Sequence, residues 1–340
     1  MSLRFDRLVS LLIVGTLVLV SSAGHAAGFN CSKAASAAEK AICANDTLSK
    51  LDEKLSDAWT YAPGLHSGSV ATKASQVQWL KLRDACGADV SCLKRAYTGR
   101  LAALVNAQFP AGADQSGNRL EALVPKDDST DADAEGCTAD KRICVQLDKV
   151  QLGRDANAPA VMRINYAGAS PFTYRFTLPD TGPDSQDTVE YGTVTLWPRV
   201  LRPAGDNDAI LVGAIYYSLT GYSGGSGSAS ELRLFWVSRN QAASQARKVL
   251  SVPIGGSLST RACFSDEDER KQGGVCRDET NFIATLGLDP TVTSGFPLLA
   301  YRTRATSPRC TYKRTFQLKR GSGVYMPDQP LPNCDDVIGP

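Results

Sequence analysis

The first part of the chain carries apolar residues at intervals of three and four, a pattern typical of amphipathic helices. A capping box, Ser36-x-x-Glu39, predicts a short helix that ends near Cys43. Asp46 can cap a second helix, a third is expected from Ala71 to Cys86, and a fourth follows the turn "GADVS". The apolar positions of the last three are Leu48, Leu51, Leu55, Ala58 and Trp59, then Val77, Trp79, Leu80 and Leu82, then Leu93, Ala96, Tyr97, Leu101 and Leu104.

From Cys144 onward the period changes to two. Short alternating or apolar runs are separated by Gly, Pro, Asn and Asp, which predicts β-strands. These runs favour a single all-β domain, and a sandwich rather than a small propeller or barrel. The runs are "CVQLDKVQL", "VMRINYA", "FTYRFTL", "TVTLW", "AILVGAIYYSL", "ELRLFWVS", "RKVLSVPI", "FIATLGL", "LLAYRTRA" and "TYKRTFQLK".

The two patterns predict an α plus β protein with its helices and strands in separate domains. A disulfide-stapled helical hairpin or small helical bundle is expected over residues 28–110, and an all-β, sandwich-like domain over 137–340. Between them, residues 111–136 are acidic and rich in Gly, Ser and Asp, which favours a flexible linker. Its "DDSTDADAE" run lacks the central glycine and terminal glutamate of an EF-hand loop, so calcium binding is not favoured.

Residues 1–27 have the features of a secretory signal peptide. Arg4 and Arg7 precede an apolar run from Leu8 to Val20, and small residues follow, so cleavage is expected after Ala26 or Ala27. The run is too short to span a bilayer, so no membrane span is expected after cleavage. We therefore expect a periplasmic or secreted protein of the bacterial envelope.

Export determines how the ten cysteines are interpreted. An even number in an oxidising compartment predicts disulfides rather than thiol chemistry. The close pairs 86/92, 137/144 and 263/276 suggest local disulfides, although the sequence does not fix the connectivity. The chain has no Cys-x-x-Cys, which argues against zinc. The disulfide candidates are Cys31, Cys43, Cys86, Cys92, Cys137, Cys144, Cys263, Cys276, Cys310 and Cys334.

Histidine is nearly absent, and this disfavours an enzyme. The chain has two histidines, of which His25 leaves with the signal peptide and His66 sits in a Pro/Gly/Ser turn. Serine and cysteine nucleophiles are usually activated by a neighbouring histidine. No carboxylate pair stands out for glycoside hydrolysis. We expect no catalytic residues, no cofactor and no metal site.

The distribution of charge argues against a nucleic-acid partner. Residues 28–110 hold ten Lys/Arg and seven Asp/Glu, a net charge of +3, and residues 137–340 hold 23 and 20, again +3. Residues 111–136 hold two and seven, a net charge of −5. No segment has the clustered basic stripe of a nucleic-acid-binding surface.

Two segments of the helical part have a specific pattern, "FNCSKAASAAEKAICANDTLSKLDEKLSDAW" and "QVQWLKLRDACGADVSCLKRAYTGRLAAL", with four cysteines in register. In these segments, residues 29–106 resemble the N-terminal domain of the LprI-type lysozyme inhibitor family. The resemblance implies a stapled helical module that binds lysozyme-type muramidases, and it covers under a third of the chain. No family is recognised for the β domain. The motif positions, for which we expect a structural role at the helix interface, are Trp79, Arg83, Asp84, Tyr97 and Arg100.

Two further segments are candidate partner contacts. Asp266, Glu267, Asp268 and Glu269 lie between Cys263 and Cys276 and could dock a cationic protein, although Ser265 as a cap and acids in the first turn also predict a short helix. The Gly/Ser-rich stretch "YSLTGYSGGSGSASEL" is expected to be a hairpin loop, and its tyrosines, Tyr217 and Tyr222, could form an adaptable binding tip.

These observations favour a non-enzymatic exported binding protein, and the family resemblance implies lysozyme inhibition by blocking the enzyme's cleft. The alternative is a structural or envelope-interaction module that binds cell-wall polymer or a protein partner through the β domain. A hydrolase that uses carboxylates alone is a third, weaker reading.

Overall fold

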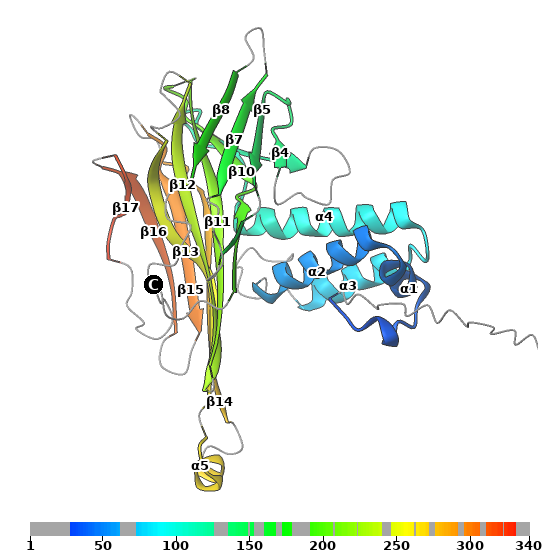
Figure 1. The fold of residues 1–340 in the computed structure, drawn as a ribbon. Coiled ribbons are helices and arrows are strands. Elements are labelled where there is room, and N and C mark those ends of the chain that lie inside the picture. Colours follow the sequence, from blue (N-terminus) through cyan, green and yellow to red (C-terminus); the bar gives the residue numbers. More distant parts are fainter. Residues whose placement is uncertain are drawn as a thin grey trace, which may run out of the picture.

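The computed structural model describes most of the chain after residue 27. The described ranges are 28–61, 73–125, 135–148, 150–152, 160–167, 172–178, 191–206, 208–222, 224–239, 246–261, 263–271, 276–291, 296–306, 311–321 and 323–330. The expected signal peptide, His66, the acidic run 127–134, Cys310 and Cys334 lie outside them. Figure 1 shows a group of helices beside a large β structure, so the predicted fold class is confirmed.

The described residues of the helical module form four α-helices. After a 3-10 turn at Cys31–Lys33 come α1 (Ala37–Ala44), α2 (Asp46–Tyr61), α3 (Lys73–Asp84) and α4 (Val90–Gln108). The predicted capping box starts α1, because the Ser36 hydroxyl accepts a hydrogen bond from the Glu39 amide and the Glu39 carboxylate accepts one from the Ser36 amide. Asp89 caps α4 by accepting hydrogen bonds from the amides of Ser91 and Cys92.

The core of this module differs from the prediction at α3. Trp79 and Arg83, four residues apart on one face of α3, are buried, but Val77 and Leu82 are 52% and 68% exposed. The helix packs through one face only, so two of its predicted core positions point to solvent. The buried core consists of Ala38, Ile42, Leu48, Leu51, Leu55, Trp79, Leu93, Tyr97, Leu104, Ala107 and, from the β structure, Ile283.

The described strands form two antiparallel sheets. Nine of the ten predicted runs each fall on one strand, whereas "CVQLDKVQL" is divided between β5 and β6, which belong to different sheets. The five-stranded sheet has the order β3-β4-β5-β7-β8. Its strands are β3 (Val124–Pro125), β4 (Glu135–Cys137), β5 (Ile143–Leu147), β7 (Val161–Tyr166) and β8 (Phe172–Thr177).

The second sheet has twelve strands, with the main order β1-β2-β10-β11-β12-β13-β14-β15-β16-β17, while β9 pairs with both β6 and β11. Its strands are β1 (Gly112–Ala113), β2 (Arg119–Ala122), β6 (Val150–Leu152), β9 (Tyr191–Leu196), β10 (Arg199–Arg202), β11 (Ala209–Tyr222), β12 (Gly225–Ser238), β13 (Arg247–Arg261), β14 (Arg277–Leu288), β15 (Leu299–Thr306), β16 (Tyr312–Arg320) and β17 (Tyr325–Pro327).

The large sheet has a core on each face, which follows from the alternation of side chains along a strand. One core lies between the two sheets and joins residues such as Val145 and Phe176 to Val212 and Phe235, giving the sandwich-like arrangement. The other joins Leu120 of β2 to Leu211, Trp236 and Tyr301. Because β2 also contacts β14, the large sheet curls around this second core.

The expected flexible linker over 111–136 is wrong for its described parts. Residues 112–113, 119–122 and 124–125 form strands β1, β2 and β3, and 135–137 form β4. Leu120 is only 2% exposed and packs in the core of the large sheet. The apolar runs in this acidic stretch are too short to show a period of two. They form strands because β2 pairs with β10 and β3 pairs with β4.

The helical module is joined to the β structure at the end of α4. Phe109, the residue after α4, packs edge-on against Trp197 with ring centroids 6.0 Å apart. The Gln108 side chain donates hydrogen bonds to the carbonyls of Ile254 and Ala284. A Cβ on Gly287 would lie 2.9 Å from Pro110 Cγ, which shows how closely the two parts approach. The two predicted domains therefore share an interface.

Four disulfides link neighbouring segments, as expected for eight of the ten cysteines. They join Cys31 to Cys43, Cys86 to Cys92, Cys137 to Cys144, and Cys263 to Cys276. The first two fasten the helical module, and the last lies at the end of strands β13 and β14. Within the described ranges no helix is long and apolar enough to cross a membrane.

Candidate functional site

One buried network of the helical module contains three of the family-motif residues, Trp79, Arg83 and Tyr97. The Trp79 indole N–H donates to the Ala96 carbonyl at 3.1 Å, and its ring meets Tyr97 edge-on at 5.2 Å. The Arg83 guanidinium lies 5.8 Å from the Trp79 ring centroid, within range of a cation–π contact. These contacts tie α3 to α4, which fits a structural role for the motif.

Asp52 of α2 lies at the centre of this network. The Tyr97 hydroxyl donates to Asp52 Oδ1 at 2.6 Å, and Arg83 Nη1 lies 4.0 Å from the same oxygen. Burial, followed by the hydrogen bond to Asp52, raises the pKa of Tyr97 far above its usual value. Burial alone would lower the pKa of Arg83, but its hydrogen bonds to Asp84, at 2.9 and 2.7 Å, and its interactions with Tyr97 together outweigh that effect and raise the pKa. Asp84 thus pairs with Arg83, its neighbour in the sequence.

Arg100 forms a separate contact at the other end of α3. Its guanidinium donates to Gln76 at 2.9 and 3.1 Å and to Ser75 at 3.2 Å, and it lies 5.4 Å from the Trp59 ring centroid. Burial lowers the pKa of Arg100. Since Trp79, Arg83, Tyr97 and Arg100 are all buried, they cannot contact a partner directly.

The surface that the helical module offers is the outer side of α3. Val77 and Leu82 are exposed there, together with Gln78 and Lys81. A helix that exposes two large aliphatic side chains among few charges has an apolar surface suited to a protein contact. We call this surface the α3 face, defined by Val77, Gln78, Lys81 and Leu82.

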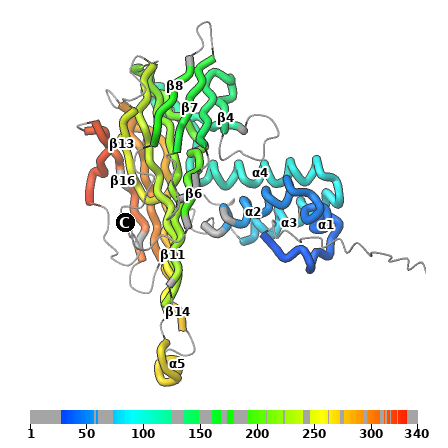
Figure 2. The backbone as a smooth tube through the Cα atoms, in the orientation of Figure 1, coloured from blue at the N-terminus to red at the C-terminus, as the bar shows by residue number. Residues whose placement is uncertain are grey.

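A second exposed feature is a long projection from the large sheet, which we call the arm. It consists of the paired segments 217–222 of β11, 225–230 of β12, 255–261 of β13 and 277–281 of β14. Figures 1 and 2 show the arm extending away from the body of the sheet, with a short helix at its end. The expected Gly/Ser hairpin loop over 217–232 is therefore wrong, because β11 runs to Tyr222 and β12 starts at Gly225.

Cross-strand contacts explain why this small-residue segment is a strand. Ser228 and Ser257, which face each other across β12 and β13, have hydroxyl oxygens 2.8 Å apart. Tyr217 is half-buried within the sheet, opposite Ser230, rather than at a loop tip. Tyr222 pairs with Gly225 at the turn, and the direction of its side chain lies outside the described structure.

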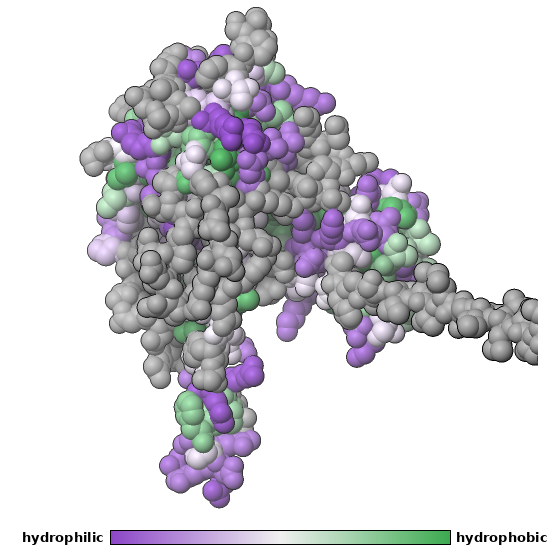
Figure 3. All heavy atoms as spheres, in the orientation of Figure 1, coloured by the Kyte–Doolittle hydropathy of each residue, from purple (hydrophilic) through white to green (hydrophobic). Residues whose placement is uncertain are grey.

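The acidic cluster lies at the tip of the arm, in α5 (Asp266–Lys271). As predicted, Ser265 caps this helix, because its hydroxyl accepts a hydrogen bond from the Asp268 amide at 3.2 Å. The Ser265 hydroxyl donates back to Asp268, which lowers the pKa of that carboxyl. Lys271 pairs with Glu267 at 2.8 Å. Figure 3 shows hydrophilic residues over this end of the molecule. The acidic residues therefore form the solvent-facing first turn of α5.

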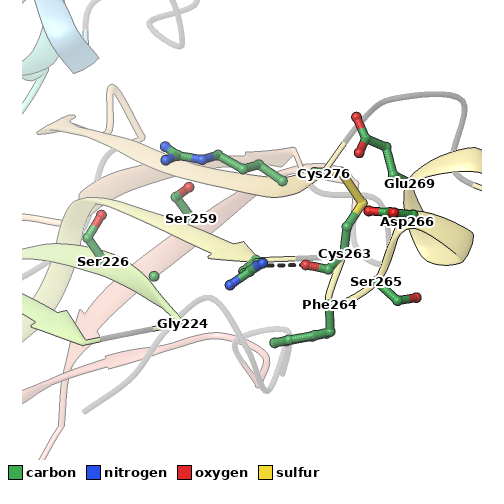
Figure 4. A pocket seen from close by; sticks show the side chains of 12 residues that line it. Gly224, Ser226, Ser259, Cys263, Phe264, Ser265, Asp266, Glu269 and Cys276 are labelled. Atoms are coloured by element: carbon green, nitrogen blue, oxygen red, sulfur yellow. Dashed lines mark hydrogen bonds between the residues drawn. A yellow bond between two sulfur atoms is a disulfide. The ribbon is translucent and has the colours of Figure 1, made fainter.

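A cavity of about 640 Å³ lies where the strands of the arm meet α5. Figure 4 shows Ser226 and Ser259 on the strands, the Cys263–Cys276 disulfide, and Asp266 beside that disulfide. Arg261 Nε donates to the Cys263 carbonyl at 2.6 Å, and Arg277 faces Arg261 across the strands. The neighbouring Phe264 is 73% exposed. The tip thus combines two cations, two acids, hydroxyls and an exposed aromatic ring, which suits a polar ligand or a protein surface.

The described residues contain no group of three His, Cys, Asp or Glu side chains that could hold a metal ion. The residues that sequence reasoning missed are Asp52 and Phe264. Asp52 has the ordinary appearance of a polar position on an amphipathic helix, and only its contact with Tyr97, 45 residues away, reveals its place in the network. Phe264 could have been noticed as an aromatic residue beside a cysteine and an acidic run.

Comparison with known proteins supports an LprI-like region. Curated proteins named lipoprotein LprI, from Mycobacterium bovis (strain ATCC BAA-935 / AF2122/97) and from Mycobacterium tuberculosis strains CDC 1551 / Oshkosh and ATCC 25618 / H37Rv, are each 38% identical to this chain over 87 residues. The match covers 25% of this chain and 43% of each relative, less than half of the relatives' length. No family model matches the chain, and no solved structure matches it.

Proposed function

We propose that this protein is an exported, non-enzymatic binding protein that inhibits lysozyme-type muramidases by occupying their substrate cleft. The observation that carries the proposal is the LprI-like region, which the sequence resemblance assigns to the helical module. The disulfides and the lack of a membrane-spanning helix in the described residues are compatible with export to the periplasm or beyond.

The chemistry of the helical module favours a steric mode of inhibition. Four of its five motif residues are buried and connect α2, α3 and α4, while one disulfide fastens the N-terminal segment to α1 and another fastens the turn between α3 and α4. A rigid surface loses little conformational entropy when it binds, so it can occupy a cleft at low cost. Its net charge of +3 opposes attraction to a cationic lysozyme, so affinity should come from apolar contact and vary little with salt.

The α3 face is the part of the module that we propose contacts the muramidase. Full burial of an aliphatic side chain stabilises a complex by about 1.5–3 kcal/mol. Loss of Leu82 from the contact should therefore weaken inhibition by roughly tenfold or more. Val77 should contribute similarly, because it is also more than half exposed in the free protein.

The test is a cell-wall lysis assay in which the mature chain is titrated against several lysozymes. The double variant Val77→Ser/Leu82→Ser should inhibit at least tenfold more weakly, while Lys73→Ser, an exposed change on the same helix, should inhibit normally. Because all three positions are exposed, the variants should have unchanged melting temperatures. An unchanged inhibition constant for the double variant would remove the α3 face from the proposal.

The arm supports a second candidate, an envelope-interaction module that binds wall polymer or a protein partner through the β domain. The observation that favours it is the exposed Phe264 at the tip, fixed beside the Cys263–Cys276 disulfide. Aromatic side chains provide a large contact area with few rotatable bonds, which suits such a projection.

Variants of the arm distinguish the two candidates, because lysozyme inhibition and cell-wall binding can be measured separately for each variant. Phe264→Ser should leave lysozyme inhibition intact and reduce co-sedimentation with purified cell wall if the arm is the envelope contact. Neutralising Asp266, Glu267, Asp268 and Glu269 together should slow lysozyme capture at low salt only if the acids attract the enzyme. If the mature chain slows no lysozyme tested, the inhibitor proposal is wrong and the envelope-binding candidate takes its place.

A further inference from the structure

The described structure begins with a close contact between Gly28 and helix α2. The Gly28 backbone nitrogen donates a hydrogen bond to Asp52 Oδ2 at 2.9 Å. A Cβ on Gly28 would lie 2.8 Å from Ser56 Cβ and 3.3 Å from the Asp52 carbonyl oxygen. The backbone therefore approaches α2 more closely than any residue with a side chain could without displacement, and Gly28 fits this place because it has none.

Asp52, which accepts the hydrogen bond from Gly28, is itself part of the buried network of the helical module. It is only 8% exposed, and its second oxygen accepts the hydrogen bond from the Tyr97 hydroxyl at 2.6 Å. Among the described residues its nearest cation is Arg83, whose Nη1 lies 4.0 Å away. That guanidinium is already hydrogen-bonded to Asp84 through two of its nitrogens, at 2.9 and 2.7 Å.

The network of Asp52, Arg83 and Asp84 thus contains two carboxylates and one guanidinium. A nearly buried carboxylate with a cation only as near as 4.0 Å is incompletely compensated, because it has lost most of its hydration and shares its counter-charge with Asp84. A further positive charge near Asp52 Oδ2 would balance the network. The atom that already occupies this position is the Gly28 nitrogen.

The predicted signal peptide provides a way to place a charge on that atom. We propose that the leader is removed by hydrolysis of the Ala27–Gly28 bond, and that the new α-ammonium of Gly28 forms an ion pair with Asp52. The hydrolysis consumes one water molecule, the new carboxylate remains on Ala27, and the amine remains on Gly28. An α-amino group beside a carboxylate is protonated at neutral pH. Removal of the leader would then add a second positive charge to the network of Asp52, Arg83 and Asp84.

Cleavage one residue earlier would have a different result. With Ala27 retained, the Gly28 nitrogen stays an uncharged amide, and the ammonium moves one residue away, a Cα–Cα distance of about 3.8 Å. The amide could still donate its hydrogen bond, but the ion pair with Asp52 would be lost. The sequence allows cleavage after Ala26 or Ala27, and the contact with Asp52 selects the second.

The first test is to determine the N-terminal residue of the protein exported with its own leader, by Edman degradation and intact mass. We expect a single species that begins at Gly28. A mature protein that begins at Ala27, or at any other residue, would overturn the proposal. This measurement does not depend on whether the protein inhibits a lysozyme.

The second test measures the ion pair itself in the full mature chain. Proteins that begin at Gly28 and at Ala27 are each prepared with Asp52 and with Asp52→Asn. The added Ala27 should lower the melting temperature by about 2–4 °C when residue 52 is aspartate and by less than about 1 °C when it is asparagine. Equal losses in the two backgrounds would show that no ion pair forms.

A third measurement avoids any substitution at Asp52, in case the asparagine variant does not fold. The difference in melting temperature between the Gly28 and Ala27 proteins is followed from 0.02 to 1 M salt. We expect the difference to shrink as the ionic strength rises, because salt screens a partly exposed ion pair. A difference that does not change with salt would assign it to packing against Ser56 and overturn the ion pair.

Discussion

Arg199 joins the helical module to the β structure, and its substitution tests whether the two parts unfold together. It lies on β10 and is 3% exposed. Its Nε donates to the Phe109 carbonyl at 2.7 Å, its Nη1 to the Pro198 carbonyl at 2.9 Å, and its Nη2 to Asn106 at 3.3 Å. Burial lowers the pKa of Arg199 to about 10, so the guanidinium still carries its charge at neutral pH.

The expected cost of Arg199→Met follows from these contacts. Methionine can fill much of the space but donates no hydrogen bond, so the Phe109 carbonyl at the end of α4 loses its donor. An unsatisfied buried polar group costs about 1–3 kcal/mol. Removing a buried charge recovers some desolvation energy, which keeps the net loss within that range rather than above it.

The assay is urea unfolding of the oxidised mature chain, followed by far-UV circular dichroism and by tryptophan fluorescence. In the unmodified protein the two probes should give one transition, because the helical and β cores share an interface. In Arg199→Met the helical signal should be lost at a lower urea concentration, and the fluorescence signal should divide into two transitions, because Trp59 and Trp79 lie in the helical module and Trp197 and Trp236 in the β structure.

The control is Arg163→Met, which removes a bidentate ion pair with Asp148 at 2.7 and 2.9 Å on the surface of the small sheet. A surface pair is worth about 0–1 kcal/mol, so this variant should be nearly as stable as the parent. If Arg199→Met loses no more stability than Arg163→Met and its probes still coincide, Arg199 does not couple the two parts.

Three further predictions concern the core, pH dependence and oxidation state. Tyr97→Phe leaves Asp52 Oδ1 without its 2.6 Å donor and should lower the free energy of unfolding by about 1–3 kcal/mol in urea, whereas a loss under about 0.5 kcal/mol would contradict the network. Hydrogen bonds from the Ser36 and Ala35 amides lower the pKa of Glu39 below 4.5, so its contribution is present above that pH and is lost on acidification. The melting-temperature deficit of Glu39→Ala should therefore be largest near neutral pH and shrink toward pH 3; a constant deficit would refute this. Thiol titration of the denatured, unreduced mature protein should find almost no free thiol, including at Cys310 and Cys334, and two or more per chain would contradict a complete disulfide framework.

Local sequence signals gave the correct elements where the determining contacts are close in the chain. The Ser36/Glu39 capping box and the Ser265 cap of α5 both form as predicted, because each joins residues three positions apart. Most β-strands were also predicted, because the alternation of apolar and polar residues follows the alternation of buried and exposed side chains along a strand.

Prediction failed where pairing with distant strands decides the structure. The Gly/Ser-rich segment 217–232 has a composition typical of loops, yet it forms strands up to Tyr222 and from Gly225, because β11 pairs with β12 and β12 pairs with β13. Leu120 lies in an acidic stretch with no visible period, and its burial depends on β10, which is about eighty positions later. Val77 and Leu82 show the opposite error, because they were expected in the core and are exposed. Amphipathic spacing identifies the apolar side of a helix, but it does not show whether another element covers that side.

The sequence by itself therefore determined the two classes of structure, their order along the chain, three close cysteine pairs and the resemblance on which the proposed function depends. Only the tertiary structure decided which surfaces remain free for a partner, namely the α3 face and the tip of the arm. It alone brought Gly28, Asp52, Arg83 and Tyr97 together and joined Arg199 to the end of α4. The physical reason is that helix and strand periods depend on neighbouring residues, whereas burial, charge balance and exposed surface depend on segments that meet only when the chain has folded.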